Sequence, residues 1–127
     1  MPRVLCVDHV QLAMPRGEEQ AARDFYAGVL GLVEIPKALD RVARGGVWFR
    51  CGELQVHLGV EDPFRPAKKA HPGFVVDDLA GFINSLRDRG LIAPTQVEKI
   101  AGGARIFTED PFGNRIELIQ TRETTTP

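Results

Sequence analysis

Alternating apolar and polar residues predict that the chain begins with a strand. In segment 4–14, Val10, Leu12 and Met14 alternate with polar or small residues such as His9 and Gln11. This period of two is typical of a strand with one buried face. Comparable patterns predict further strands near 32–35, 46–51, 54–60, 71–76, 95–98, 104–108 and 115–120. Only Gly52 and Glu53 separate the third and fourth strands, which indicates a tight hairpin.

Two segments instead have helical spacing. Segment 18–30 carries one apolar stripe, formed by Ala22, Phe25, Tyr26, Val29 and Leu30, and Gly31 follows its expected end. The second helix is predicted from Asp77 or Asp78 to Arg89, with Leu79, Phe82, Ile83 and Leu86 on one face. Both helices therefore have one face suited to covering a sheet.

The order of these elements repeats. The chain reads βαβββ over 4–60, a linker over 61–70 (EDPFRPAKKA), and βαβββ again over 71–120. We therefore predict an α+β fold class, with two βαβββ modules in one domain that spans 1–127, and a disordered tail over 121–127. A module of roughly 60 residues buries little surface alone, so each is expected to pack against a partner.

Composition excludes several classes of protein. The chain has 127 residues, of which 43% are hydrophobic, and 16 basic residues oppose 17 acidic ones. No basic run suggests nucleic acid binding, and no apolar stretch approaches the roughly 20 residues that span a bilayer. No signal peptide is recognised, and Cys6 and Cys51 form no CxxC pair. We expect a cytoplasmic protein with two reduced thiols.

The repeat places four side chains with ligand chemistry at two equivalent pairs of positions. His9 and His71 open the first strand of each module, at an offset of 71 − 9 = 62, and His57 and Glu117 lie in the last strands, at an offset of 117 − 57 = 60. Strand alternation puts each opposite the apolar face. Three imidazoles and a carboxylate gathered on one side predict a divalent metal site that leaves open coordination positions.

Simpler interpretations stay open for the same residues. Most strand histidines are structural, and Glu117 could pair with Arg115 on the same face of its strand. Gln11 and Gln55 are expected beside the site, although exposed glutamines are common. Three aromatic residues could line a pocket or could pack in the core, namely Trp48, Phe49 and Phe107.

Four motifs carry a resemblance to a known family. They are DHVQLAM, FYAGVLGL, HPGFVVDDLAGF and DPFGNRIELIQ. At these residues the chain resembles the vicinal oxygen chelate superfamily, which includes glyoxalase I, fosfomycin-resistance thiol transferases, bleomycin-binding proteins and extradiol dioxygenases. The resemblance implies an incomplete mixed-sheet barrel with helices outside, a divalent ion (Zn, Ni, Mn, Mg or Fe) and a homodimer.

The resemblance also assigns roles. It implies that His9, His71 and Glu117 are metal ligands, and that His57 occupies the fourth-strand position, where bacterial glyoxalase I has a glutamate. We expect His57 to be a fourth ligand or the catalytic base. Glu117 is also expected to take part in catalysis. Substrate contacts are expected from loops 37–44 and 99–105.

The implied function is that of a metal-dependent lyase or isomerase, which binds a small molecule through neighbouring oxygens. Two alternatives remain. The first is an extradiol-type dioxygenase. The second is a non-catalytic protein that sequesters a drug, as the bleomycin-resistance proteins do.

Overall fold

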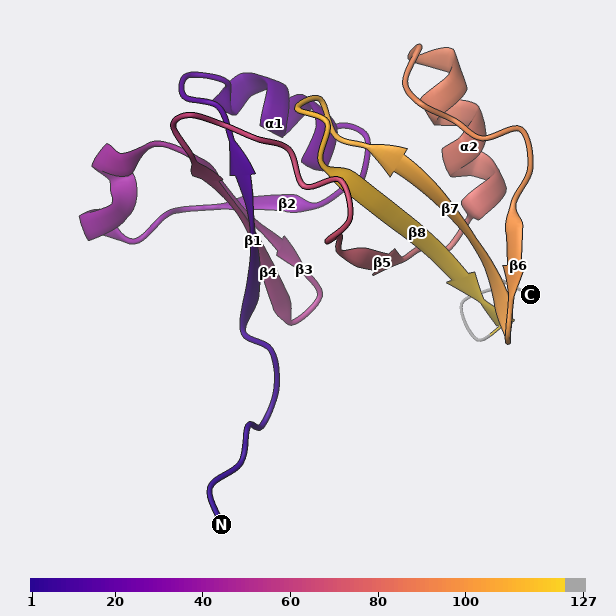
Figure 1. The fold of residues 1–127 in the computed structure, drawn as a ribbon, viewed down its shortest axis with the longest axis horizontal. Coiled ribbons are helices and arrows are strands. Elements are labelled where there is room, and N and C mark those ends of the chain that lie inside the picture. The colour runs from indigo at the N-terminus through magenta and orange to yellow at the C-terminus, as the bar shows by residue number, and fades with distance from the viewer. Residues whose placement is uncertain (123–127) are drawn as a thin grey trace. The chain divides into compact units, whose positions relative to one another are not determined.

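The computed structural model describes residues 1–122. The chain divides into two compact units, Met1–Arg65 and Pro66–Pro127, which we call module 1 and module 2. Module 1 contains β1 (His9–Met14), α1 (Glu19–Tyr26), β2 (Val33–Ile35), the short 3₁₀ helix η1 (Leu39–Arg44), β3 (Val47–Cys51) and β4 (Leu54–Val60). Module 2 contains β5 (Gly73–Val75), α2 (Leu79–Asp88), β6 (Glu98–Ile100), β7 (Gly103–Glu109) and β8 (Arg115–Thr121), as Figure 1 shows.

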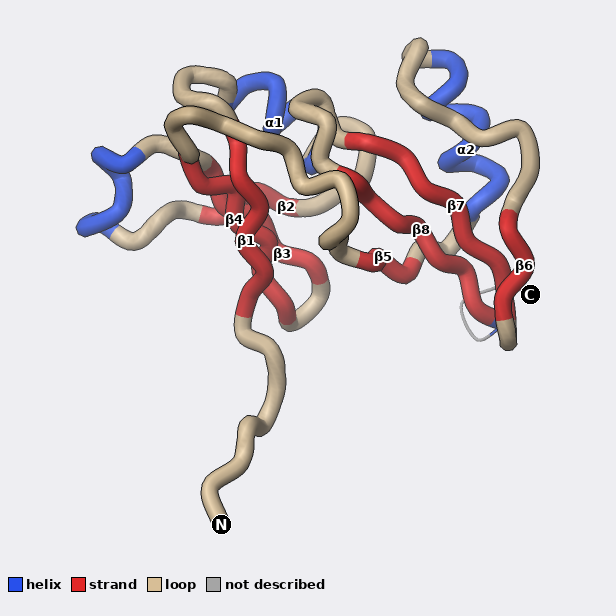
Figure 2. Tube along the Cα trace, in the orientation of Figure 1, coloured by secondary structure: helices blue, strands red, loops and turns tan. Residues whose placement is uncertain are grey.

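Both modules have the same sheet topology. The strand order is β1-β4-β3-β2 in module 1 and β5-β8-β7-β6 in module 2, and Figure 2 shows the four strands of each sheet. In each sheet the first strand pairs parallel to the last one, and the other pairs are antiparallel. The predicted α+β class and the two βαβββ modules are confirmed.

One face of each sheet forms the core of its module. In β4, Val56 and Leu58 have no exposed surface, and Phe49 of β3 lies beside the Tyr26 ring of α1 with a centroid distance of 5.6 Å. In β8, Ile116 and Leu118 are likewise fully buried. This is the apolar face that the alternation predicts. Of the three aromatic residues with an open assignment, Phe49 is therefore a core residue.

The second helix begins at a side-chain cap. The Asp78 carboxylate accepts a hydrogen bond from the Gly81 backbone amide at 2.9 Å, which satisfies one of the free N–H groups of the first turn. A Cβ built on Gly81 would lie 2.3 Å from Asp78 Oδ2, so a side chain there would displace the cap. The predicted N-terminal signal for α2 is confirmed at Asp78.

The predicted first strand is too long at its N-terminal end. β1 starts at His9, where its ladder with β4 begins, and Val4, Leu5 and Val7 are exposed. Apolar composition alone had extended the strand to residue 4. At the other end, β8 continues to Thr121, one residue into the expected tail, and residues 123–127 lie outside the described residues.

Two further predictions concerned the cysteines and membrane-spanning segments. Cys6 and Cys51 are both free thiols, and burial raises the pKa of Cys51. No helix within residues 1–122 combines the length and the apolarity that crossing a membrane would require.

Candidate functional site

Each module contains two of the four predicted ligand residues. His9, His57 and Glu117 lie on strands β1, β4 and β8. His71 does not, because β5 begins at Gly73, two residues later than the position that the sequence predicted for the start of this strand. The strand registers show that the modules repeat in detail: Gln11 and Trp48 are the cross-strand partners of His57. In module 2, Gly73 and Phe107 are the partners of Glu117 in the same way. Each last-strand donor therefore has an aromatic residue on its antiparallel neighbour.

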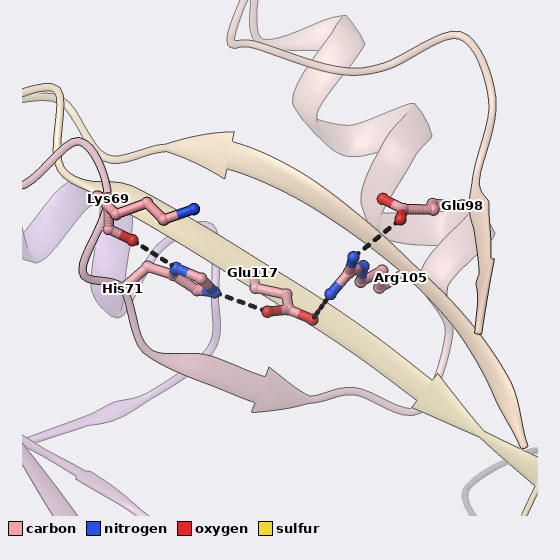
Figure 3. Close-up of polar contacts among 5 residues, drawn as sticks. All are labelled: Lys69, His71, Glu98, Arg105 and Glu117. Carbon is pink, nitrogen blue, oxygen red and sulfur yellow. Dashed lines mark hydrogen bonds and ion pairs between the residues drawn. The ribbon is translucent and has the colours of Figure 1, made fainter. Parts of the chain in front are cut away.

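In module 2, His71 and Glu117 are in direct contact. His71 Nε2 lies 2.8 Å from Glu117 Oε1, and His71 Nδ1 lies 2.9 Å from the Lys69 carbonyl oxygen, as drawn in Figure 3. A carbonyl can only accept, so Nδ1 carries a hydrogen. In a neutral imidazole the Nε2 lone pair then faces a carboxylate oxygen. Two acceptors at this distance require a proton or another cation between them.

The other oxygen of Glu117 is also engaged. Arg105 Nη1 lies 3.4 Å from Glu117 Oε2, and Arg105 Nη2 lies 2.8 Å from Glu98 Oε1, so the guanidinium bridges two carboxylates (Figure 3). The hydrogen bond that Arg105 donates to Glu98 is the main reason that the pKa of Arg105 is raised. Glu117 is only 7% exposed, so its charge depends on these partners.

The cation beside Glu117 is not the one that the sequence suggested. Arg115 instead lies over the Phe107 ring, with its guanidinium carbon 3.9 Å from the ring centroid. Arg105 comes from the neighbouring strand β7, two residues from Phe107, which is the cross-strand partner of Glu117. A diagonal pairing of this kind depends on the register, and the sequence does not give the register directly.

In module 1, His9 and His57 belong to a ring stack. The His57 ring is parallel to the Trp48 ring, at a centroid distance of 3.8 Å and an interplanar angle of 2°. On its other side, the His9 ring lies 4.4 Å away at 17°. Trp48 and Phe107 thus both contact a predicted ligand residue, since Phe107 meets His71 edge-on at 5.2 Å.

The hydrogen bonds of the three histidines differ in a way that bears on metal binding. His9 Nδ1 lies 2.9 Å from Asp8 Oδ2, so His9 and His71 both donate from Nδ1, and Nε2 is the nitrogen through which either could bind an ion. His57 instead donates from its other ring nitrogen, because its Nε2 lies 2.9 Å from the Gln55 side-chain oxygen, which can only accept. A neutral His57 could therefore bind an ion only through Nδ1.

The surroundings of His57 favour its neutral form. Burial lowers its pKa below the ordinary value of 6.5, and the neighbouring His9 and Lys37 lower it further, while Asp8 acts in the opposite direction. Neutral imidazole is the form that can accept a proton or bind a metal ion. The environment of His57 thus suits either of its two predicted roles.

Trp48 should report this titration. Because the His57 pKa is lowered, His57 should become charged only below pH 6.5, and a charged imidazole quenches a stacked indole. We expect the fluorescence of Trp48, the only tryptophan, to fall with a midpoint below pH 6.5. His57→Gln should remove the transition. His9→Gln should keep it and shift its midpoint upward; a midpoint at or above 6.5 in the parent protein would contradict the assignment.

The donor chemistry of each pair fits a divalent cation. Each module supplies two donors, and backbone or side-chain acceptors fix the tautomers of His9 and His71 as they do for histidine ligands. Among residues 1–122, however, no three His, Cys, Asp or Glu side chains form a group that could hold an ion. The four-ligand set therefore stays a prediction.

Comparisons with known proteins agree with the fold. The sequence model of the Glyoxalase/Bleomycin resistance protein/Dioxygenase superfamily matches residues 7–118. Among solved structures, a glyoxalase family protein from Bacillus anthracis is 40% identical with a TM-score of 0.86, and the match covers 96% of this chain and 99% of that one. A search of curated proteins found no match.

More distant structures share the fold alone. A lactoylglutathione lyase from Agrobacterium tumefaciens is 20% identical with a TM-score of 0.68, over 93% of this chain and 95% of that one. A genomically encoded fosfomycin resistance protein from Listeria monocytogenes is 15% identical with a TM-score of 0.75, over 98% and 100%. With the family model matched over most of the length, the chain belongs to the Glyoxalase/Bleomycin resistance protein/Dioxygenase superfamily.

Proposed function

We propose that the chain is a divalent-metal-dependent lyase or isomerase of the glyoxalase type, which binds a small substrate through two neighbouring oxygens. The observation that carries the proposal is the contact between His71 and Glu117. There an imidazole nitrogen and a carboxylate oxygen lie 2.8 Å apart, with the imidazole oriented by a backbone carbonyl. The residues that would hold the ion are His9, His71 and Glu117, with His57 as a further candidate.

The bound ion would supply electrostatic stabilisation of negative charge on the substrate oxygens. The protein's own residues would do the rest. Trp48 and Phe107 would present aromatic surface beside the donors, and the Asp8 and Lys69 acceptors would hold His9 and His71 in one tautomer. Neutral His57, whose pKa is lowered, would accept a proton from the substrate.

The test of this proposal is elemental analysis of protein purified without chelators. We expect the purified protein to contain a stoichiometric amount of a divalent metal. In deuterated buffer, the same protein should exchange the proton next to the carbonyl of a 2-oxo or 2-hydroxy substrate. Iron together with oxygen uptake on catechols would select the dioxygenase instead. Against that alternative, the only tyrosine, Tyr26, is the last residue of α1 and is fully buried, so it is unsuited to act on a substrate.

A metal-free binding protein is the second candidate, and one observation favours it. Arg105 already supplies a cation to Glu117, at 3.4 Å, so the buried carboxylate has a charge partner without any metal. The same elemental analysis decides between the two. Protein that contains no metal, and takes none up on dialysis against Zn²⁺, Ni²⁺, Mn²⁺, Mg²⁺ or Fe²⁺, would favour a sequestering function.

The two roles of His57 predict different results for His57→Ala. If His57 is a ligand, the variant should retain metal at least about tenfold more weakly. If it is the base, metal affinity should stay within about twofold, and proton exchange should fall by roughly 10²–10⁴. The bond from Nε2 to Gln55 and the lowered pKa lead us to expect the second result. No change in either quantity would remove His57 from the site.

A further inference from the structure

Module 1 contains a positively charged cavity whose cationic residues have no role in the proposed metal site. It has a volume of about 190 Å³, and three of its nine lining residues are cationic, namely Lys37, Arg41 and Arg44. None of its lining residues, all of which belong to the described part of the chain, is acidic. Walls of one charge sign around a small volume concentrate the electrostatic potential and attract the opposite charge.

The helix η1 brings two of these cations together. In a 3₁₀ helix the side chains at i and i+3 lie on the same side, and Arg41 and Arg44 have this spacing within Leu39–Arg44. The helix lies in the connection between β2 and β3 (Figure 2). Gly45 and Gly46 follow at φ values of +77° and +91°, which residues with a side chain rarely adopt, and return the chain to β3.

The three cationic side chains of the cavity differ in the hydrogen bonds and ion pairs that they already form with neighbouring residues. The Lys37 ammonium donates to the Gly45 carbonyl, which holds this side chain at the cavity. Arg41 Nε lies 3.4 Å from Asp40 Oδ2, a weak and exposed pair. Among the residues that the structure describes, none forms an ion pair with Arg44. The cavity thus keeps an excess of positive charge and at least one guanidinium with free donors.

This cavity adjoins the histidine pair. A second cavity, of about 260 Å³, is lined by His9 and His57 and shares Gln11, Arg41 and Trp48 with the first one. The two cavities therefore share part of their walls, and the second one is also lined by the carboxylates of Asp8 and Asp40. We call the two neighbouring cavities together the groove. A molecule in the groove could reach the histidines at one end and the guanidinium groups at the other.

We propose that the cationic cavity binds an anionic group of the substrate, a carboxylate or a phosphate monoester, and so makes the enzyme selective for small organic anions. Arginine suits this task because its planar fork of N–H groups matches the oxygens of both anions. The proposal rests on the proposed function only for the chemistry at the histidine end. Binding of the anion itself needs no metal.

The test uses Trp48 fluorescence in the presence of a chelator, so its outcome does not depend on metal binding. Benzoate, phenyl phosphate and neutral benzamide are titrated into the parent protein. All three offer the same aromatic ring to Trp48, and only two are charged. We expect saturable binding of one or both anions, at least about tenfold tighter than that of benzamide, and the tighter anion identifies the natural group.

Variants locate the site. Arg44→Gln should weaken binding of the anion about tenfold and leave benzamide binding unchanged. Lys37→Gln should act in the same direction, with an additional effect from the lost contact to Gly45. Arg16→Gln is the matched control, because Arg16 is exposed, belongs to the same module and does not line the groove. Equal affinity for benzoate, phenyl phosphate and benzamide, or equal effects of Arg16→Gln and Arg44→Gln, would overturn the proposal.

Discussion

Glu117→Gln is expected to abolish stoichiometric metal retention and, with it, turnover. The amide preserves the shape of the side chain and removes the negative charge, and a neutral amide is a far weaker ligand for Zn²⁺ or Ni²⁺ than a carboxylate. We expect metal affinity to fall by at least about tenfold. Elemental analysis after dialysis against a weak chelator measures the effect, and circular dichroism checks that the variant is folded.

Glu98→Gln is the matched control for this variant. Glu98 and Glu117 both bind the Arg105 guanidinium, but Glu98 is exposed and makes no contact with His71. It should retain the metal of the parent protein. If both variants lose metal equally, the loss comes from a disturbed Arg105 and not from a missing ligand.

Arg105→Met separates the two functions proposed for the module. The change removes the cation that competes for Glu117, and it also removes a buried Nε atom that has no hydrogen-bond partner. If Glu117 is a metal ligand, the variant should hold the metal at least as tightly as the parent protein. If the carboxylate serves only as a partner of Arg105, the variant should contain no metal and should unfold at a lower temperature, because a buried charge loses its partner.

The sequence predicted the fold well because the repeat constrained it. Single strands such as Val33–Ile35 and Glu98–Ile100 have three residues each and carry little signal alone. Two copies of βαβββ made each of them expected from the other copy. The predicted boundaries were less accurate, since the first helix ends at Tyr26, four residues before its apolar stripe does. Past that point the Gly28 amide bonds to the Arg23 carbonyl, five residues back, which breaks the helical pattern.

The sequence predicted which residues belong to the candidate site, but not which side chains contact one another there. The candidates His9, His57, His71 and Glu117 came from two patterns in the sequence. The repeat gave the equivalent positions, and the two-residue period of a strand gave the face. They could not give the stacking of Trp48 on His57 or the bond from Arg105 to Glu117, which depend on how neighbouring strands are aligned. The η1 helix was also missed, since LDRVAR has no apolar stripe and none of its residues is buried.

Asp110→Ala is expected to be among the most destabilising single substitutions in the chain. Asp110 is 4% exposed, and its carboxylate accepts hydrogen bonds of 2.9 Å from the backbone amides of Phe112 and Asn114 and from the Asn114 side chain. Alanine would remove the acceptor of all three bonds in a turn that Gly113 closes at a φ of +92°. We expect a loss of about 3 kcal/mol in the free energy of unfolding and a fall in Tm of roughly 10 °C.

Two further variants make this expectation specific to the hydrogen bonds. Asp110→Asn should cost less, because its remaining oxygen can still accept from the backbone, although its amide would face the Asn114 amide as a second donor. Asp88→Ala, at an exposed position of α2, should change stability by no more than about 0.5 kcal/mol. An Asp110→Ala variant as stable as Asp88→Ala would show that the turn does not depend on the carboxylate.

The turn also bears on the candidate site, so Asp110→Ala should loosen the proposed metal ligands of module 2. Asn114 Oδ1 accepts from the Ala67 amide at 2.9 Å, and the Arg115 amide donates to the Ala67 carbonyl at 2.9 Å. These bonds fix the segment that leads to His71 against the start of β8, which carries Glu117. If the turn positions both donors, metal affinity should fall together with stability in the alanine variant, at temperatures where it is still fully folded. Unchanged affinity in the folded variant would show that His71 and Glu117 are held in place without it.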